Sequence, residues 1–351
     1  MDKRKQLRGT NGTEASLLFL TPYFHQGRGN ATTAKRIVSG LQLNDVKTNV
    51  VAYDEEIVSS EVLNSSELLH VLHFRRFADW LEENSVTLER PFVITSGGTD
   101  VNIDIFKEEH EKKIGAVLKR AAAITVFSED AKRKLCSVYR GLEEKIHIIK
   151  QSVWFPETDD EVGGNSVELP QEGLNIVLPA GLRAVKDVLF VLPALVKLKD
   201  EFSNLTFTII GAPLEDEVLR EVREAMKKYP WIQYYEEVPL EEMASIYNNS
   251  DMIINTSLSE GQSSALLEAM YVGKPVIARN NGGNRSINQH GETGFLFDDV
   301  DEFYQCVERL LTDESLRATI CGNARQYVKE SHSLQQEIES YVSLYEKVLS
   351  D

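Results

Sequence analysis

Cysteine is scarce in this sequence, and long hydrophobic runs and an excess of basic residues are both missing. The 351 residues include three cysteines, which lie far apart and lack the paired spacing of a zinc site or a disulfide framework. No apolar run approaches the roughly 18 residues that a membrane-spanning helix needs. Acidic residues outnumber basic ones by 55 to 38, and a net charge of −17 repels a phosphate backbone. These features argue against a zinc protein, a nucleic-acid-binding protein and a membrane-spanning protein.

Short apolar runs of strand-forming residues alternate with longer segments of helical spacing. The runs occupy 17–21, 49–53, 68–72, 92–95, 123–127 and 146–149, then 175–179, 206–211, 232–235, 252–255, 275–278 and 294–297. Strands that are apolar throughout and separated by helices indicate parallel sheets that are covered on both faces. Two such series in one chain of this length predict two doubly wound α/β domains.

The domain boundaries follow from composition. Residues 156–172 are acidic, contain two prolines and two glycines, and show no periodicity, which is typical of a linker. The predicted organisation is a disordered leader at 1–16, a first domain at 17–155, the linker at 156–172, a second domain at 173–332 and a C-terminal helix at 333–350. The leader has too few apolar residues for a secretory signal, so we expect a cytoplasmic protein. Seven N-x-S/T sequons leave the secretory pathway as an alternative.

The segment after the 252–255 run carries the most informative chemistry. Glu260 and Gly261 lie in a predicted loop, and a helix follows that Ser263 or Ser264 can cap. The free N–H groups at a helix N-terminus form a site for a diphosphate. Glu260 and Glu268 would repel that diphosphate unless they bind hydroxyl groups on either side of it, as a nucleotide sugar would require. The alternative is that Glu260 is a solvated loop residue and that Glu268 is a capping or ion-pair residue on an ordinary helix.

The same segment resembles the donor-site motif of the retaining family 4 glycosyltransferases of the GT-B class. The matching residues are Glu260-Gly261, Leu267-Glu268-Ala269-Met270, Gly273-Lys274-Pro275-Val276-Ile277 and Gly282-Gly283. The resemblance implies two Rossmann-like domains facing a cleft, with the C-terminal helix crossing back to the first domain. It also implies that Glu260 contacts the donor sugar and that Glu268 holds the ribose. Gln262 and Ser263 depart from the common Phe-Gly, and Ser286 stands where a glutamate is common.

Two cations follow the first strand of the second domain. Arg183 and Lys186 are three residues apart at the predicted start of a helix, where the helix dipole disfavours positive charge. A bound diphosphate would remove that conflict. The resemblance implies the same role, although the spacing from Gly181 is one residue shorter than usual. The alternative is that both are surface charges.

Two loops of the first domain contain further candidates. Gly27 and Gly29 form a loop of close backbone approach, which the resemblance places near the diphosphate and the acceptor. Asp100 follows the 92–95 strand and is a candidate acceptor-binding residue, with a simple turn as the alternative. Ser96 stands where many family members have a histidine, and His73 is a further candidate after the 68–72 strand.

The sequence thus predicts a retaining, metal-independent glycosyltransferase that moves a sugar from a nucleotide-diphosphate-sugar donor to an acceptor hydroxyl of unknown identity. No cofactor and no metal site are expected, because Arg183, Lys186 and a helix N-terminus can carry the charge of the leaving group. Two alternatives remain open: a non-catalytic nucleotide-sugar-binding protein, and a nucleotide-sugar epimerase on the same scaffold. A dinucleotide-dependent dehydrogenase is disfavoured, because the third glycine of its fingerprint is missing.

Overall fold

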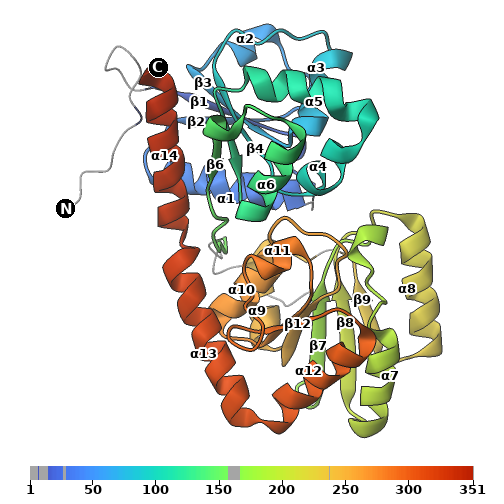
Figure 1. Ribbon diagram of the computed structural model, residues 1–351. Coiled ribbons are helices and arrows are strands. Elements are labelled where there is room, and N and C mark those ends of the chain that lie inside the picture. Colours follow the sequence, from blue (N-terminus) through green and yellow to red (C-terminus); the bar gives the residue numbers. More distant parts are fainter. Residues whose placement is uncertain (1–6, 8–14, 27–28, 157–166, 237, 351) are drawn as a thin grey trace. The chain divides into compact units, whose positions relative to one another are not determined.

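The computed structural model describes residue 7 and residues 15–26, 29–156, 167–236 and 238–350. The chain forms two compact units, one of Met1–Gln151 with Leu334–Asp351 and the other of Ser152–Ser333. Each unit contains one six-stranded sheet with its helices (Figure 1).

The sheet of the first unit is parallel throughout. Its strands follow the order β2 (Thr48–Ala52), β1 (Leu17–Thr21), β3 (Leu68–Leu72), β4 (Phe92–Thr95), β5 (Ala123–Val126) and β6 (Ile146–Ile148). The connecting helices are α1 (Gly29–Leu43), α2 (Ser60–Leu63), α3 (Phe74–Glu83), α4 (Thr99–Asn102), η1 (Asp104–Phe106), α5 (Glu108–Arg120), α6 (Glu129–Val138) and η2 (Glu143–Lys145). Alternate residues of a strand point to opposite faces, so Leu18 and Leu20 pack in one core while Leu17 and Phe19 pack in the other.

The sheet of the second unit is also parallel. Its order is β12 (Phe295–Phe297), β11 (Val276–Arg279), β10 (Met252–Asn255), β7 (Leu174–Pro179), β8 (Leu205–Ile210) and β9 (Ile232–Tyr235). The helices are η3 (Ala184–Lys186), α7 (Leu192–Glu201), α8 (Asp216–Lys228), α9 (Leu240–Asn248), α10 (Ser264–Val272), α11 (Gly282–Arg285), α12 (Val300–Thr312) and α13 (Glu314–Ser331). Each strand end of both sheets lies within one residue of its prediction, and the two doubly wound α/β domains are confirmed.

The C-terminal helix α14 (Leu334–Ser350) belongs to the first unit. Arg36 of α1 donates two hydrogen bonds of 3.0 Å to the two carboxylate oxygens of Glu337, and both side chains are at most 3% exposed. Tyr345 lies 2.5 Å from a ring nitrogen of His70 on β3. These buried polar contacts hold α14 against α1 and the sheet, which confirms the predicted return of the C-terminal helix to the first domain.

The predicted leader and linker fall largely outside the described residues, which omit 1–6, 8–14 and 157–166. Leu7 and Ala15 are buried in the core beside β1, so at these two positions the predicted leader is packed rather than disordered. The compact units divide after Gln151 and after Ser333. Of the described residues, no helix is both long enough and apolar enough to span a membrane.

Candidate functional site

The loops after β7 and β10 are neighbours, because these strands pair where the strand order of the second sheet reverses. Ligands of open α/β sheets bind at such a switch point, beyond the carboxyl ends of the strands. The β7 loop carries Lys186 and the β10 loop carries Glu260. Lys186 Nζ lies 2.5 Å from Glu260 Oε1, and the two side chains are only 17% and 11% exposed. Lys186 and Glu260, far apart in the sequence, therefore form one mostly buried ion pair.

Glu260 is held as a carboxylate by several donors. Its Oε1 also accepts hydrogen bonds from Ser257 Oγ at 2.7 Å and from Asn255 Nδ2 at 3.1 Å. Burial alone would raise the pKa of Glu260, but the charge of Lys186 and these hydrogen bonds outweigh burial and lower it. Glu260 is thus an ionised, oriented carboxylate at the switch point.

The β7 loop corrects the predicted helix start at Arg183 and Lys186. Residues Ala184–Lys186 form only the short 3-10 helix η3, and the helix α7 begins at Leu192. Asp187 follows with a left-handed backbone at φ 43° and accepts a 2.7 Å hydrogen bond from Arg279 at the end of β11. The two cations therefore lie in a tight loop, and the helix-dipole argument for them is wrong.

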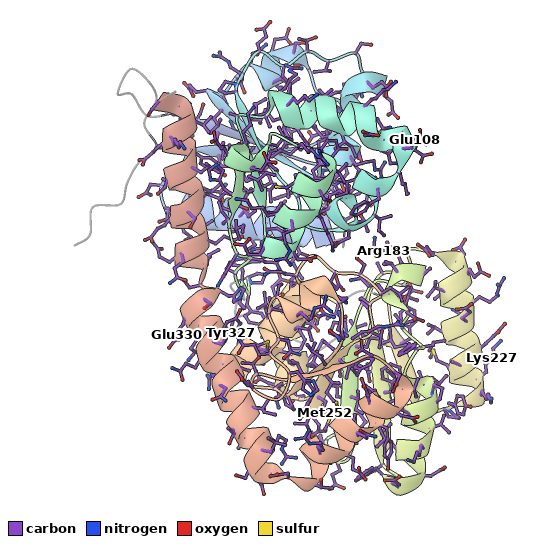
Figure 2. The ribbon with its side chains drawn as sticks, in the orientation of Figure 1. Glu108, Arg183, Lys227, Met252, Tyr327 and Glu330 are labelled. Carbon is purple, nitrogen blue, oxygen red and sulfur yellow. The ribbon has the colours of Figure 1, made fainter. Side chains whose placement is uncertain are left out.

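Arg183 precedes η3 in the loop after β7, and Figure 2 labels it there, whereas the labelled Met252 begins the neighbouring strand β10 and so marks the opposite, amino end of the strands. The Nε atom of Arg183 is buried and has no hydrogen-bond partner among the described residues. A buried donor without a partner is unfavourable, and an anionic ligand would remove that penalty. Arg183 is therefore suited to bind a diphosphate in this loop.

Helix α10 presents its N-terminus just after Glu260. Ser263 caps it, with Oγ accepting from Leu266 N at 3.4 Å, as the sequence predicted, and Ser264 is the first helical residue. Glu268 lies four residues further, about 6 Å along the axis, and is half-buried. It accepts a 2.7 Å hydrogen bond from Tyr247 Oη. The helix thus begins four residues after Glu260 in the sequence and carries a second carboxylate about one turn from its start.

Helix α11 fixes the shape of the Glu260 loop. A Cβ added to Gly283 would lie 2.3 Å from the carbonyl oxygen of Glu260 and 2.5 Å from that of Gly261, so the two backbones touch. Gln262 Nε2 donates a 3.1 Å hydrogen bond to Ser286 Oγ. Two of the three positions that depart from the family pattern, Gln262 and Ser286, are thus in contact. This pair links the loop to the end of α11.

The first-unit candidates have different surroundings. Asp100 is 1% exposed, and its Oδ1 accepts hydrogen bonds from the N–H groups of Gly98 and Val101 at 3.1 and 3.0 Å. Gly29 begins α1, and a Cβ there would meet no atom of the described residues within 4 Å, so its predicted approach to a ligand stays a prediction. Gly27 lies outside the described residues.

Several polar residues around Glu260 were missed by the sequence interpretation. Asn255 contacts both Glu260 and the Ser263 hydroxyl, and it accepts a 3.0 Å hydrogen bond from Asn284. Asn281 donates to the carbonyl of Ser257 at 2.9 Å. The sequence signal that could have identified these residues is their position at the carboxyl ends of the runs that form the neighbouring strands β10 and β11. Across the described part of the chain, no three His, Cys, Asp or Glu residues gather as a metal site would require.

Solved structures identify the class of this fold. The structure is similar to HepE of Anabaena, solved in complex with UDP and glucose, with a TM-score of 0.74, 15% identity and coverage of 94% of this chain and 99% of that one. It is also similar to sucrose-phosphate synthase of Thermosynechococcus elongatus, with a TM-score of 0.76, 14% identity and coverage of 95% and 99%. The two Rossmann-like domains are those of the GT-B class.

Sequence comparison identifies the family. A family model described as "Glycosyl transferases group 1" matches residues 165–327. The chain is 31% identical to glycosyltransferase 1 domain-containing protein 1 of Xenopus tropicalis over 90% of this chain and 93% of that protein. It is 27% identical to spore coat protein SA of Bacillus subtilis, over 64% and 62% of the two chains. The chain belongs to the group 1 glycosyltransferases, and the protein is a glycosyltransferase.

Proposed function

We propose that this glycosyltransferase moves a sugar from a nucleotide-diphosphate-sugar to an acceptor hydroxyl, with retention of anomeric configuration and without a metal ion. The observation that carries the proposal is the buried pair of an ionised Glu260 and Lys186 at the switch point of the second sheet. UDP and UDP-glucose are bound in solved structures of the same fold, which supports a nucleotide sugar as donor.

The proposed donor site has a role for each group. Lys186 and Arg183 bind the diphosphate together with the N–H groups at the start of α10, the segment that contains Ser263 and Ser264. This positive charge stabilises the leaving diphosphate, so the reaction needs no metal ion. The carboxylate of Glu260 accepts hydrogen bonds from hydroxyls of the donor sugar.

The remaining candidates surround this centre. Glu268, one turn into α10, accepts hydrogen bonds from the ribose hydroxyls. Gly261 and Gln262 shape the loop that contacts the sugar. The acceptor binds to the first unit, where Gly27, Gly29 and Asp100 are the candidates. Because all three cysteines are free thiols, we also propose that the enzyme works in the reducing cytoplasm.

Donor binding is tested by a thermal-shift screen of the full chain against UDP-, GDP- and ADP-sugars, with and without EDTA. A donor at about 100 times its dissociation constant adds about 2.7 kcal/mol of stability. We expect a shift for one nucleotide class that EDTA leaves unchanged. A shift that disappears with EDTA contradicts metal independence, and the absence of any shift contradicts the donor site.

Transfer is tested with the donor so identified. Proton NMR of the first product reports the anomeric configuration, and we expect retention. Glu260→Gln keeps a side chain that accepts from Ser257 while removing the charge, and we expect it to lower turnover at least 100-fold. Arg220→Ala, which removes an exposed cation of α8, is the matched control. Donor binding without product would indicate a binding protein, and a product without acceptor would indicate an epimerase.

A further inference from the structure

His73 has a backbone conformation that histidine does not favour. It follows β3 and precedes α3, with φ 70° and ψ 87°, in the left-handed region. Glycine and asparagine adopt this region most readily, and an asparagine side chain also caps helices well. Residues held in such strained conformations concentrate at functional sites. Because Asn would serve the turn and the cap better, the imidazole ring itself must account for the histidine.

One side of the ring is occupied. His73 Nδ1 lies 3.4 Å from the N–H of Arg76, which it caps, and 3.6 Å from Asp100 Oδ2. Within the described part of the chain, Nε2 has no hydrogen-bond partner, and the side chain is 8% exposed. Asparagine could make the Nδ1 contacts but has no counterpart of Nε2. The atom that distinguishes histidine from asparagine here is therefore the one without a partner.

Asp100 is fully engaged within the protein. Its Oδ1 accepts from two backbone N–H groups, its Oδ2 accepts from Ser96 Oγ, and the side chain is 1% exposed. Of His73 and Asp100, therefore, only His73 has a polar side-chain atom without a partner, Nε2, and a side chain in contact with solvent. Asp100 Oδ2 lies beside the ring, 3.6 Å from Nδ1; because Nδ1 accepts from the N–H of Arg76, the proton of the neutral ring is on Nε2.

The position in the sheet indicates a ligand. In the first unit the strand order reverses between β1 and β3, so His73, the residue that joins β3 to α3, lies at the switch point of this sheet. We propose that Nε2 of His73 binds a hydroxyl group of the acceptor, and that Asp100 and Ser96 position the ring. This inference rests on the proposed function and reassigns the acceptor contact from Asp100 to His73.

The charged groups facing the ring determine its ionisation. Burial lowers the pKa of His73, Asp100 and Asp104 raise it, and Arg75 and Arg76 lower it further, with a net decrease. The ring is therefore neutral at pH 7, and Nε2 can form a hydrogen bond with a hydroxyl group. Asp100→Asn removes a negative charge beside the ring, which lowers the pKa of His73 further. The acid limb of the pH–rate profile should then move to lower pH.

The decisive variant is His73→Asn in the full chain. Asn fits the backbone and the cap but has no atom at Nε2, so we expect wild-type thermal stability. The labelled donor found in the thermal-shift screen is incubated with methyl glycosides, glycerol and a small-molecule cell extract. Four quantities are measured for each variant: transfer, donor hydrolysis by water, and the KM values for donor and acceptor. His73→Gln, whose amide can reach the level of Nε2, is the rescue variant.

We expect His73→Asn to lower acceptor kcat/KM at least 50-fold, with donor KM and donor hydrolysis within twofold of wild type. His73→Gln should recover at least a fifth of the transfer. Transfer by His73→Asn within threefold of wild type overturns the proposal, and so does an equal loss of donor binding. A wild-type protein that transfers to nothing overturns the proposed function and this inference with it.

Discussion

Gly283→Ala is the sharpest single test of the donor loop, because the new methyl group would meet backbone rather than a flexible side chain. Its Cβ would lie 2.3 Å from the carbonyl oxygen of Glu260, whereas real Cβ contacts do not fall below 3.0 Å. The loop must therefore move by at least 0.7 Å, the difference between these two distances. A misplacement of about 1 Å at an active site costs about 100-fold in rate, or about 2.7 kcal/mol of transition-state stabilisation.

The assay is turnover of the identified donor by purified full-length protein, with urea unfolding measured alongside. Overpacking should also cost about 1–3 kcal/mol of unfolding free energy. The matched control is Gly322→Ala within α13, where a Cβ meets nothing within 4 Å. Alanine in a helix interior stabilises by about 0.5–1 kcal/mol relative to glycine, with no change in turnover expected. Wild-type turnover by Gly283→Ala would show that the Glu260 loop has no catalytic role or that it tolerates displacement.

Three further changes test other parts of the structure. Glu337→Ala leaves Arg36 buried and unpaired, and we expect the free energy of unfolding measured in urea to fall by about 3–5 kcal/mol. The control Glu339→Ala, at an exposed position of the same helix, should lower it by less than about 0.5 kcal/mol, and equal losses would contradict the prediction. Burial lowers the pKa of His70 to about 3, so the unfolded chain binds a proton below pH 6.5 that the folded chain does not. The free energy of unfolding should therefore fall by up to about 1.4 kcal/mol per pH unit between pH 6 and pH 4. It should fall less steeply in His70→Asn, and parallel curves of unfolding free energy against pH for the two proteins would contradict the prediction. Arg279→Ala removes the ion pair with Asp187 in the β7 loop, and we expect the KM for the donor to rise about tenfold while the free energy of unfolding stays unchanged. An unchanged KM would argue against a role of this ion pair in ordering the loop.

The strands could be predicted from the sequence because most of them are buried on both faces. Runs such as 68–72 and 252–255 are apolar except for His70 and Asn255 and are buried at every position, which is what a parallel sheet covered by helices requires. The start of α7 could not be found from apolar spacing alone, because Val188 and Leu189 continue the spacing of the helix. Pro193 was the better signal, since proline is favoured in the first turn and disfavoured in a helix interior.

The candidate site was predictable only in part. The presence of Glu260 and Lys186 in adjacent loops follows from strand order, because both lie at carboxyl ends of strands in one sheet. Their direct ion pair, and the support of Glu260 by Asn255, depend on loop conformations that no periodicity encodes. The contact of His73 with Asp100 joins two loops through a strained backbone, which sequence patterns do not report.

The Lys186–Glu260 ion pair sets a condition on donor binding. A diphosphate carries more charge than Glu260, so in the proposed reaction it draws the lysine ammonium towards the phosphates. Glu260 then loses the charge that most lowers its pKa, but it retains the hydrogen bonds from Ser257 and Asn255. Sugar hydroxyls must replace the ammonium, because an unpaired buried carboxylate is costly. The nucleoside diphosphate alone, which lacks the sugar, should therefore bind more weakly than the complete donor, and Ser257→Ala should increase that difference.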